Sequence, residues 1–180
     1  NDRFNDNISS WDVSSVTDMS GMFGDATIFN QPIGAWGTKT ASVTTMEEMF
    51  EGAEEFDQNI GAWDVSNVTT MRQMFRDDFT GNAFNNGGSP DIRNWDTSKV
   101  TNMAYMFAKN VKFNQPLGSG GGVTGWDVSG VVTFDSMFQG AEEFNQDIGS
   151  WDVSGGISNA FTKMFMGAND FNNGGSDSIK

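Results

Sequence analysis

One stretch of sequence, led by a tryptophan and closed by a Met-Phe pair, recurs along the whole chain and restricts its possible folds. Its clearest copy is WDVSNVTTMRQMF at residues 63–75. Successive tryptophans are 25, 27, 32, 31 and 25 residues apart. A period of this length indicates stacked supersecondary units, each burying its apolar face against the next. The aromatic residues expected in that core are Trp11, Trp36, Trp63, Trp95, Trp126, Trp151, Phe23, Phe50, Phe75, Phe107, Phe138 and Phe165.

Two spacings within each copy predict two kinds of element. Ile8, Trp11 and Val13 follow the spacing of a leucine-rich repeat, whose last two apolar residues alternate along a short strand. The Met-x-x-Met-Phe segment at 19–23 places its apolar residues at i, i+3 and i+4, on one face of a short helix. The sequence therefore predicts an α/β repeat, a leucine-rich-repeat-like solenoid of about six coils, one per tryptophan. Short parallel strands would form one face and short helices the other.

We expect residues 1–180 to form a single solenoid domain with insertions at 76–94 and 118–125. Longer motifs return at offsets of 84 to 88 residues, as FEGAEEFDQNIGAW does in FQGAEEFNQDIGSW. Three coils are therefore expected to form one higher-order unit. Because the chain starts with Asn1 rather than Met, we expect a mature or excised fragment. Its closing FNNGGS is similar to the opening of another unit, which favours a fragment of a longer array or an end-to-end assembly.

Composition excludes several classes of protein. The 16 Phe and 6 Trp at regular spacing supply a core, which disordered chains lack. A net charge of -14 argues against nucleic acid as a partner and against an anionic membrane surface. No apolar run reaches the roughly 20 residues of a membrane span, so direct membrane insertion is not expected. Without Cys or His the chain has no disulfides, no Cys/His zinc site and no His-based triad.

An aspartate follows five of the six tryptophans. If the strands pair in register, neighbouring carboxylates lie ~5 Å apart and repel each other unless something compensates. A row of calcium ions could do so, because hard cations prefer carboxylate oxygens. Alternatively, each Asp accepts backbone N–H groups of its own turn, which the Ser two residues later favours. The candidate calcium ligands are Asp12, Asp64, Asp96, Asp127 and Asp152, with Asp77 and Asp78 of the first insertion as a second group.

An asparagine follows the first Phe of most coils. A buried amide both donates and accepts hydrogen bonds, so one per coil can join backbone groups of neighbouring coils. This ladder is favoured over a ligand-binding role for the column Asn5, Asn30, Asp57, Asn85, Asn114, Asn145 and Asn172. Asn7 and Asn67 lie in N-x-S/T sequons and are glycosylation candidates if the source glycosylates its proteins.

The stretches WDVSSVTDMSGMFGDATIFN and WDVSNVTTMRQMF resemble the repeat, about 26 residues long, of the BspA-like leucine-rich-repeat surface proteins. The resemblance extends over nearly the whole chain. It implies a leucine-rich-repeat-like fold exposed at a cell surface, with adhesion as the role, and it supplies no catalytic residues.

We therefore expect a non-enzymatic, extracellular or cell-surface repeat protein that acts in adhesion or ligand binding, with a surface protein or a glycan as partner. In a second hypothesis, uncapped end coils stack on copies of the same chain and build a filament. A calcium-stabilised acidic scaffold is a further alternative, with calcium as its only cofactor. A hydrolase with paired carboxylates is disfavoured, since nothing in the sequence places a lone acid in an apolar pocket.

Overall fold

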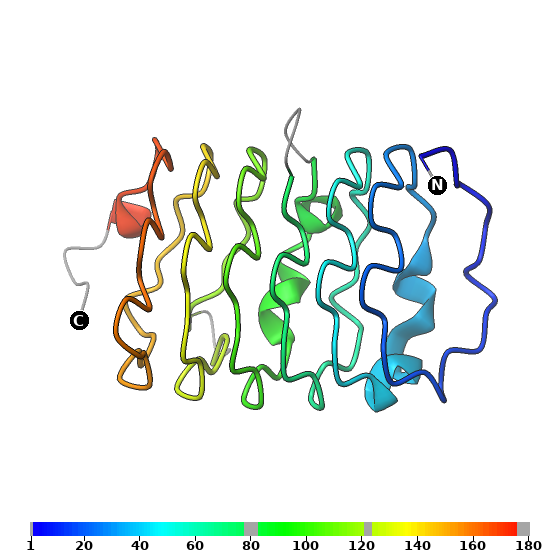
Figure 1. Ribbon diagram of the computed structural model, residues 1–180, viewed down its shortest axis with the longest axis horizontal. Coiled ribbons are helices and arrows are strands. Elements are labelled where there is room, and N and C mark those ends of the chain that lie inside the picture. The colour runs from blue at the N-terminus through cyan, green and yellow to red at the C-terminus, as the bar shows by residue number, and fades with distance from the viewer. Residues whose placement is uncertain (1, 78–82, 121–123, 176–180) are drawn as a thin grey trace.

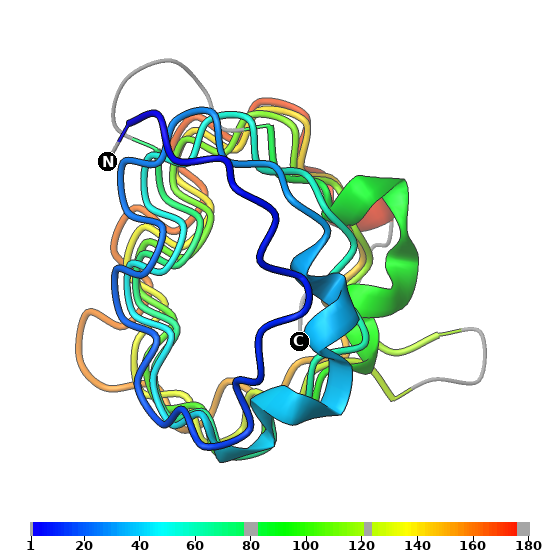
Figure 2. The ribbon, with the colours of Figure 1, turned by 90° about the vertical axis from the view of Figure 1, so that its right-hand side faces the viewer.

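The computed structural model describes residues 2–77, 83–120 and 124–175. In these ranges the chain winds into successive turns that are stacked along one axis (Figure 1). Viewed along that axis, the turns superpose around a shared interior, and the helices η1 and η3 lie on the same side of it (Figure 2). Each turn contains one of the six tryptophans, and we number these coils 1 to 6 in chain order.

The predicted leucine-rich-repeat-like α/β architecture is wrong. The described residues contain neither a strand nor an α-helix. Their helices are all of the 3-10 type, and the longest, η1, changes direction at Gly37, whose φ is 49°. Coils meet through isolated parallel bridges, each of one residue pair: Asp18–Thr45, Thr45–Thr70, Thr70–Asn102 and Asn102–Thr133. The four helices are η1 (Ile33–Ser42), η2 (Asn86–Gly88), η3 (Pro90–Asn94) and η4 (Asn173–Gly175).

Left-handed residues explain why the Met-x-x-Met-Phe segments are not helices. In each coil the third residue of the Met-x-x-Met segment, or of its Phe-x-x-Met equivalent in coils 5 and 6, has a positive φ. Examples are 58° at Glu48 and 57° at Gln73. A hydrogen bond from the Met74 N–H to the Met71 carbonyl (3.2 Å) closes the turn. A positive φ at this position is typical of a type II turn and ends a right-handed helix. Two successive turns therefore reproduce the i, i+3, i+4 spacing that predicted a helix.

The segment after each tryptophan also turns instead of extending. In coil 3 the Asp64 Oδ1 atom accepts the Ser66 N–H at 3.0 Å, which is an Asx turn. The Val68 N–H then bonds to the Val65 carbonyl at 2.9 Å. Because these backbone groups are satisfied locally, the segment does not form the strand that its alternating apolar residues predicted.

Aromatic rings fill the interior in columns. Phe75 stacks on Phe84 of the adjoining turn with ring centroids 3.9 Å apart, and on Phe107 of the next coil at 5.5 Å. Tryptophans add a further column, and the indole N–H groups of Trp36, Trp63, Trp95 and Trp126 each donate to a carbonyl of the preceding coil, as Trp63 Nε1 does to the Ile33 carbonyl at 3.0 Å. Ten of the twelve aromatic residues expected in the core are buried. Phe165 is half-buried, and Trp11, which belongs to the first of the described coils, is 49% exposed.

The Met-x-x-Met-Phe turns of successive coils lie side by side and form one side of the stack, which we call the turn face. Alternate N–H groups of one coil donate to carbonyls of the next, as Gln73 does to Ala104 (2.9 Å) and Phe75 to Met106 (2.9 Å). No helix in the described ranges has the length and apolar composition to cross a bilayer. The turn face comprises residues 19–26, 46–53, 71–77, 103–110, 134–141 and 161–168.

Candidate functional site

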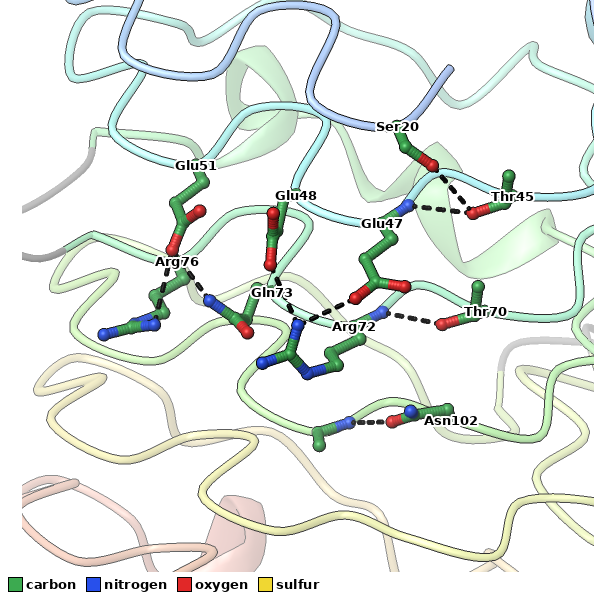
Figure 3. Close-up of polar contacts among 11 residues, drawn as sticks. Ser20, Thr45, Glu47, Glu48, Glu51, Thr70, Arg72, Gln73, Arg76 and Asn102 are labelled. Carbon is green, nitrogen blue, oxygen red and sulfur yellow. Dashed lines mark hydrogen bonds and ion pairs between the residues drawn. The ribbon is translucent and has the colours of Figure 1, made fainter. Parts of the chain in front are cut away.

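The turn face of coils 2 and 3 brings together charged side chains that lie 24 or 25 residues apart in the sequence. Thr45 and Thr70 form one of the bridges between coils 2 and 3. Their hydroxyl oxygens each accept the N–H two residues later, that of Glu47 and that of Arg72, at 3.4 Å (Figure 3). These local turns hold the Glu47 and Arg72 backbones in register, so their side chains meet across the two coils.

Arg72 lies between two carboxylates of the preceding coil. Its Nη1 atom is 2.7 Å from Glu47 Oε1 and 2.9 Å from Glu48 Oε1 (Figure 3). A second set of contacts between the same two coils lies one turn later. There Glu51 Oε1 accepts a hydrogen bond from Gln73 Nε2 at 2.7 Å and forms an ion pair with Arg76 Nη1 at 3.3 Å. We call Glu47, Glu48, Glu51, Arg72 and Arg76 the arginine cluster.

The cluster is partly exposed and contains two positive and three negative side chains. Burial opposes the charge on Arg72, but hydrogen bonds and charge attraction from Glu47 and Glu48 outweigh it and raise the pKa of its guanidinium. The side chains of Arg72 and Glu47 are each 36% exposed. Exposed ion pairs contribute little to stability, typically about 0–1 kcal/mol. The cluster therefore orients two guanidinium groups at the surface more than it stabilises the fold.

Tyr105 extends this surface into coil 4. The Arg76 guanidinium carbon lies 5.6 Å from the centroid of the Tyr105 ring, within the range of a cation–π contact. Tyr105 has a left-handed backbone, with φ 59°, and its N–H donates to the Asp135 carbonyl of coil 5 at 2.8 Å. The cluster and Tyr105 thus offer guanidinium donors and an aromatic ring on a rigid backbone, an arrangement suited to binding.

The candidate calcium ligands after the tryptophans take part in local turns. In each case Oδ1 accepts the N–H two residues later, at 3.2 Å for Asp12 and 3.0 Å for Asp152. Hydrogen bonds from Ser14 and Ser154 lower the pKa of the Asp12 and Asp152 carboxyls. Within the described ranges no group of three or more acidic side chains is placed to hold a metal ion. Asp64, Asp96 and Asp127 make the same turn contact.

The second group of candidate calcium ligands lies at the start of the first insertion. Asp77 is fully buried on the turn face, and its N–H donates to the Ala108 carbonyl at 3.0 Å. Asp78 lies outside the described residues. The structure therefore places one of these two carboxylates inside the stack and gives no position for the other.

The repeated asparagines form the predicted ladder between coils. Asn114 Oδ1 accepts the Asn145 N–H of the next coil at 3.0 Å and the Gln146 amide at 2.7 Å. Each such contact between two coils is one rung of the ladder. Asp57 forms the same rung, because its Oδ1 accepts the Asn85 N–H at 2.7 Å. Because each rung uses the side-chain oxygen as acceptor, Asp and Asn serve equally. This explains the aspartate at 57.

The two sequon asparagines are both exposed. Asn7 Oδ1 accepts the Ser9 N–H at 3.0 Å. Asn67 is bound on both sides of its amide: Nδ2 donates to the Ala41 carbonyl at 2.9 Å, and Oδ1 accepts from Lys99 Nζ at 2.6 Å. Nδ2, the atom that a glycan would modify, is thus already engaged at Asn67.

Sequence reasoning did not select the arginine cluster. Glu47 and Arg72 are 25 residues apart and each follows the first Met of its Met-x-x-Met segment. Superposing consecutive copies of the repeat would have placed them in adjacent coils. The signal that could have identified the cluster is that Glu47 and Arg72, which carry opposite charges, occupy the same position in consecutive copies of the repeat.

A family of known sequences matches the chain over two successive stretches. The family described as "Mycoplasma protein of unknown function, DUF285" matches residues 1–86 and again residues 81–178. No curated protein matches the chain. No solved structure matches it either. The two family matches meet within the predicted insertion at 76–94.

Proposed function

Since the chain belongs to the DUF285 family, whose function is unknown, we propose that it is a non-enzymatic repeat protein that binds a protein ligand at a cell surface. The extracellular or cell-surface location rests on the likeness of its WDVSxVTxMxxMF copies to the BspA-like surface proteins. The binding role, of which adhesion is one form, rests on the arginine cluster.

The observation that carries the proposal is the fixed position of Arg72 between Glu47 and Glu48 (2.7 and 2.9 Å). Ordering a long side chain on binding costs about 0.5–1.5 kcal/mol. A guanidinium that is already oriented avoids much of that cost. Arg and Tyr are also the residue types enriched at protein interfaces and among their energetic hot spots.

The surroundings of the cluster favour a partner that offers both charge and apolar surface. Two guanidinium groups, three carboxylates and the Tyr105 ring alternate across coils 2 to 4. Such mixed charge gives orientation and selectivity more than raw affinity. A protein surface supplies matching groups of both signs, and we therefore favour a protein over a glycan.

The proposal is tested by binding of the labelled chain to cultured epithelial cells. We expect saturable binding that is lost after trypsin treatment of the cells and kept after glycosidase treatment. The double variant Arg72→Ala/Arg76→Ala should bind at least about tenfold more weakly, the loss expected for removing about 1.4 kcal/mol or more of interface contact. Loss of binding only after glycosidase treatment would identify a glycan as the ligand instead.

Lys112→Ala is the matched control. Lys112 also forms an exposed ion pair, with Glu143, but lies outside the turn face. Its replacement removes a positive charge and an ion pair without touching the arginine cluster, so binding should equal that of the parent chain. Absence of saturable binding, or equal losses in the control and the double variant, would overturn the proposal.

A further inference from the structure

The two insertions of the sequence meet at one hollow between coils 4 and 5. Arg93 and Asn94, at the end of η3, come from the first insertion, and Thr124 and Gly125 come from the second. All four residues line a cavity of about 250 Å³. In the view along the stack, η3 bulges outward from the outline of the other coils (Figure 2). The cavity lies inside the stack, because coils 4 and 5 are each hydrogen-bonded to a coil on both sides.

Arg93 stands where other coils have a glycine that is covered by the next coil. The residue after the buried Ile or Leu that precedes each tryptophan is Gly34 in coil 2, Gly61 in coil 3 and Gly118 in coil 5. A Cβ atom at Gly34 would lie 2.1 Å from the Asn59 carbonyl oxygen of the next coil, and the other two glycines are covered as tightly, at 2.5 and 2.2 Å. The junction between coils 4 and 5 therefore has space for a side chain that these junctions lack.

Arg93 brings an unused positive charge to this space. It is partly buried, yet within the described ranges it forms no ion pair and no side-chain hydrogen bond. The other two partly buried arginines, Arg72 and Arg76, are both paired with carboxylates. The exposed amide of Asn94 likewise has no hydrogen bond in that part of the chain. A guanidinium carries five N–H donors, so the hollow has donors available to a ligand.

Two aspartates of the lining supply acceptors. Asp96 and Asp127 directly follow the tryptophans of coils 4 and 5 and line the cavity. Each uses Oδ1 in its own turn, where it accepts the N–H of Ser98 (3.1 Å) or Ser129 (3.0 Å). Their Oδ2 atoms accept no hydrogen bond from the described residues. The hydroxyl of the buried Thr97 donates to the Asp127 carbonyl at 2.8 Å and holds the two turns together.

This mixture of donors and acceptors disfavours a simple ion as the ligand. An anion would use Arg93 but meet two carboxylates, and a metal ion or an amine would use the carboxylates but meet the guanidinium. A sugar hydroxyl both donates and accepts, so adjacent hydroxyls use both kinds of group. A neutral sugar also gives up no hydrated charge on binding. Pockets for drug-sized ligands have about 300–1,000 Å³, so the smaller hollow suits a single sugar ring.

We propose that the hollow between coils 4 and 5 binds a neutral hexopyranose, either as a free sugar or as the end of a glycan. Adjacent hydroxyls accept from the Arg93 guanidinium and donate to the Oδ2 atoms of Asp96 and Asp127. The site is separate from the arginine cluster and goes beyond the proposed function. Because the tryptophan in its wall, Trp95, is buried and offers no ring for stacking, we expect a roughly millimolar dissociation constant.

Nuclear magnetic resonance titration of the isotope-labelled chain with D-glucose, D-galactose and D-mannose tests the proposal. We expect at least one of these sugars to shift the amide signals of Arg93, Asn94 and Asp127 saturably. Methyl glycosides of the same sugars identify the source of the ligand. Binding of both forms indicates the end of a glycan, and binding of the free sugar alone indicates a monosaccharide. No saturable shift with any of the three, at concentrations far above millimolar, would overturn the proposal.

Two variants remove one group each from the hollow. Arg93→Gly restores the glycine of the other coils, and Asp127→Asn keeps the Oδ1 acceptor of the turn but removes the charge. Each should bind the sugar about tenfold more weakly, as expected for the loss of a hydrogen bond to a charged group. Asp64→Asn is the matched control and should bind like the parent. Asp64 accepts the Ser66 N–H (3.0 Å) and its carbonyl accepts the Thr40 hydroxyl (2.9 Å), but it lies outside the hollow.

The variants also separate this site from the arginine cluster. Arg93→Gly should bind cells like the parent, and Arg72→Ala/Arg76→Ala should bind the sugar like the parent, so either proposal can fail alone. Unchanged melting curves would show that each variant is folded. Equal sugar binding by Arg93→Gly and the parent, or equal losses in Asp127→Asn and Asp64→Asn, would overturn the sugar site. Saturable shifts with inorganic phosphate or a free amino acid, and none with sugars, would replace it by a site for charged ligands.

Discussion

Asn110 is the least satisfied residue of the turn face. It is fully buried, and neither its Nδ2 nor its Oδ1 atom has a hydrogen-bond partner among the described residues. Equivalent positions in coils 1, 2, 5 and 6 carry alanine, for example the buried Ala53 and Ala141, while coil 3 has an aspartate there. A buried polar group without a partner costs about 1–3 kcal/mol. The amide at 110 is therefore a local defect in an alanine column.

We expect Asn110→Ala to raise the free energy of unfolding by about 1–2 kcal/mol, since it removes the unpaired amide and restores the alanine column. Urea and thermal unfolding would measure the change. The reverse substitution, Ala141→Asn, introduces the same defect one coil later and should be destabilising by at least as much. A less stable Asn110→Ala protein would contradict this view and indicate that the amide binds a buried water.

Tryptophans at equivalent positions differ in one hydrogen bond. Trp63 Nε1 donates to the Ile33 carbonyl at 3.0 Å, whereas the buried Trp151 Nε1 has no hydrogen-bond partner within the part of the chain that the structure describes. Trp63→Phe removes ring volume and leaves a buried carbonyl short of a donor. Trp151→Phe removes similar volume together with an unpaired N–H. We expect Trp63→Phe to be more destabilising than Trp151→Phe by about 1–3 kcal/mol in chemical denaturation. Equal losses would show that the indole bond contributes nothing.

At the scale of elements, the Asn ladder joins the coils through an acceptor. Asn114 Oδ1 serves both the Asn145 N–H and the Gln146 amide. Asn114→Ala leaves both donors without this acceptor and should cost about 1–3 kcal/mol. Asn114→Asp keeps the oxygen and, like the natural Asp57, should cost much less at neutral pH. Thermal melting of the two variants would test this, and similar losses in both would rule out the acceptor mechanism.

The same elements show what the sequence could and could not predict. The ladder role of the asparagines and the turn role of Asp64 followed from hydrogen-bonding capacity, and the structure confirms both roles. The ladder residues are half-buried or exposed rather than buried, and they join the coils as acceptors. The helix prediction was wrong because a helix and two successive turns share the i, i+3, i+4 spacing. Only the sign of φ separates them, and Gln73 and Tyr105 adopt a positive φ without being glycine.

Neighbouring coils hold those left-handed residues in place. A non-glycine residue in this region costs about 1–2 kcal/mol. The Gln73 N–H donates to the Ala104 carbonyl and the Tyr105 N–H to the Asp135 carbonyl, so each left-handed turn is fixed by the next coil. Such contacts between coils are not visible in a single copy of the repeat. The arginine cluster escaped sequence analysis for the same reason, because its partners lie in different copies.

At the scale of the whole molecule, the net charge of -14 acts against compaction. Like charges destabilise a folded chain through self-repulsion, and added salt weakens that repulsion. Any cation should therefore stabilise the stack to some extent. A calcium row along Asp12, Asp64, Asp96, Asp127 and Asp152 would add a specific contribution that saturates as its sites fill.

The geometry of these aspartates predicts that calcium has no such specific effect. Each Oδ1 is already an acceptor for an N–H of its own turn, for example that of Ser66 at Asp64 and that of Ser154 at Asp152. We expect calcium and magnesium chloride at equal concentration to raise Tm by the same amount, as sodium chloride does at matched ionic strength. Site binding would instead stabilise by RT ln(1 + [L]/Kd) for calcium alone. A saturable shift with calcium that a chelator reverses, and that magnesium does not reproduce, would contradict screening as the cause and restore the calcium scaffold.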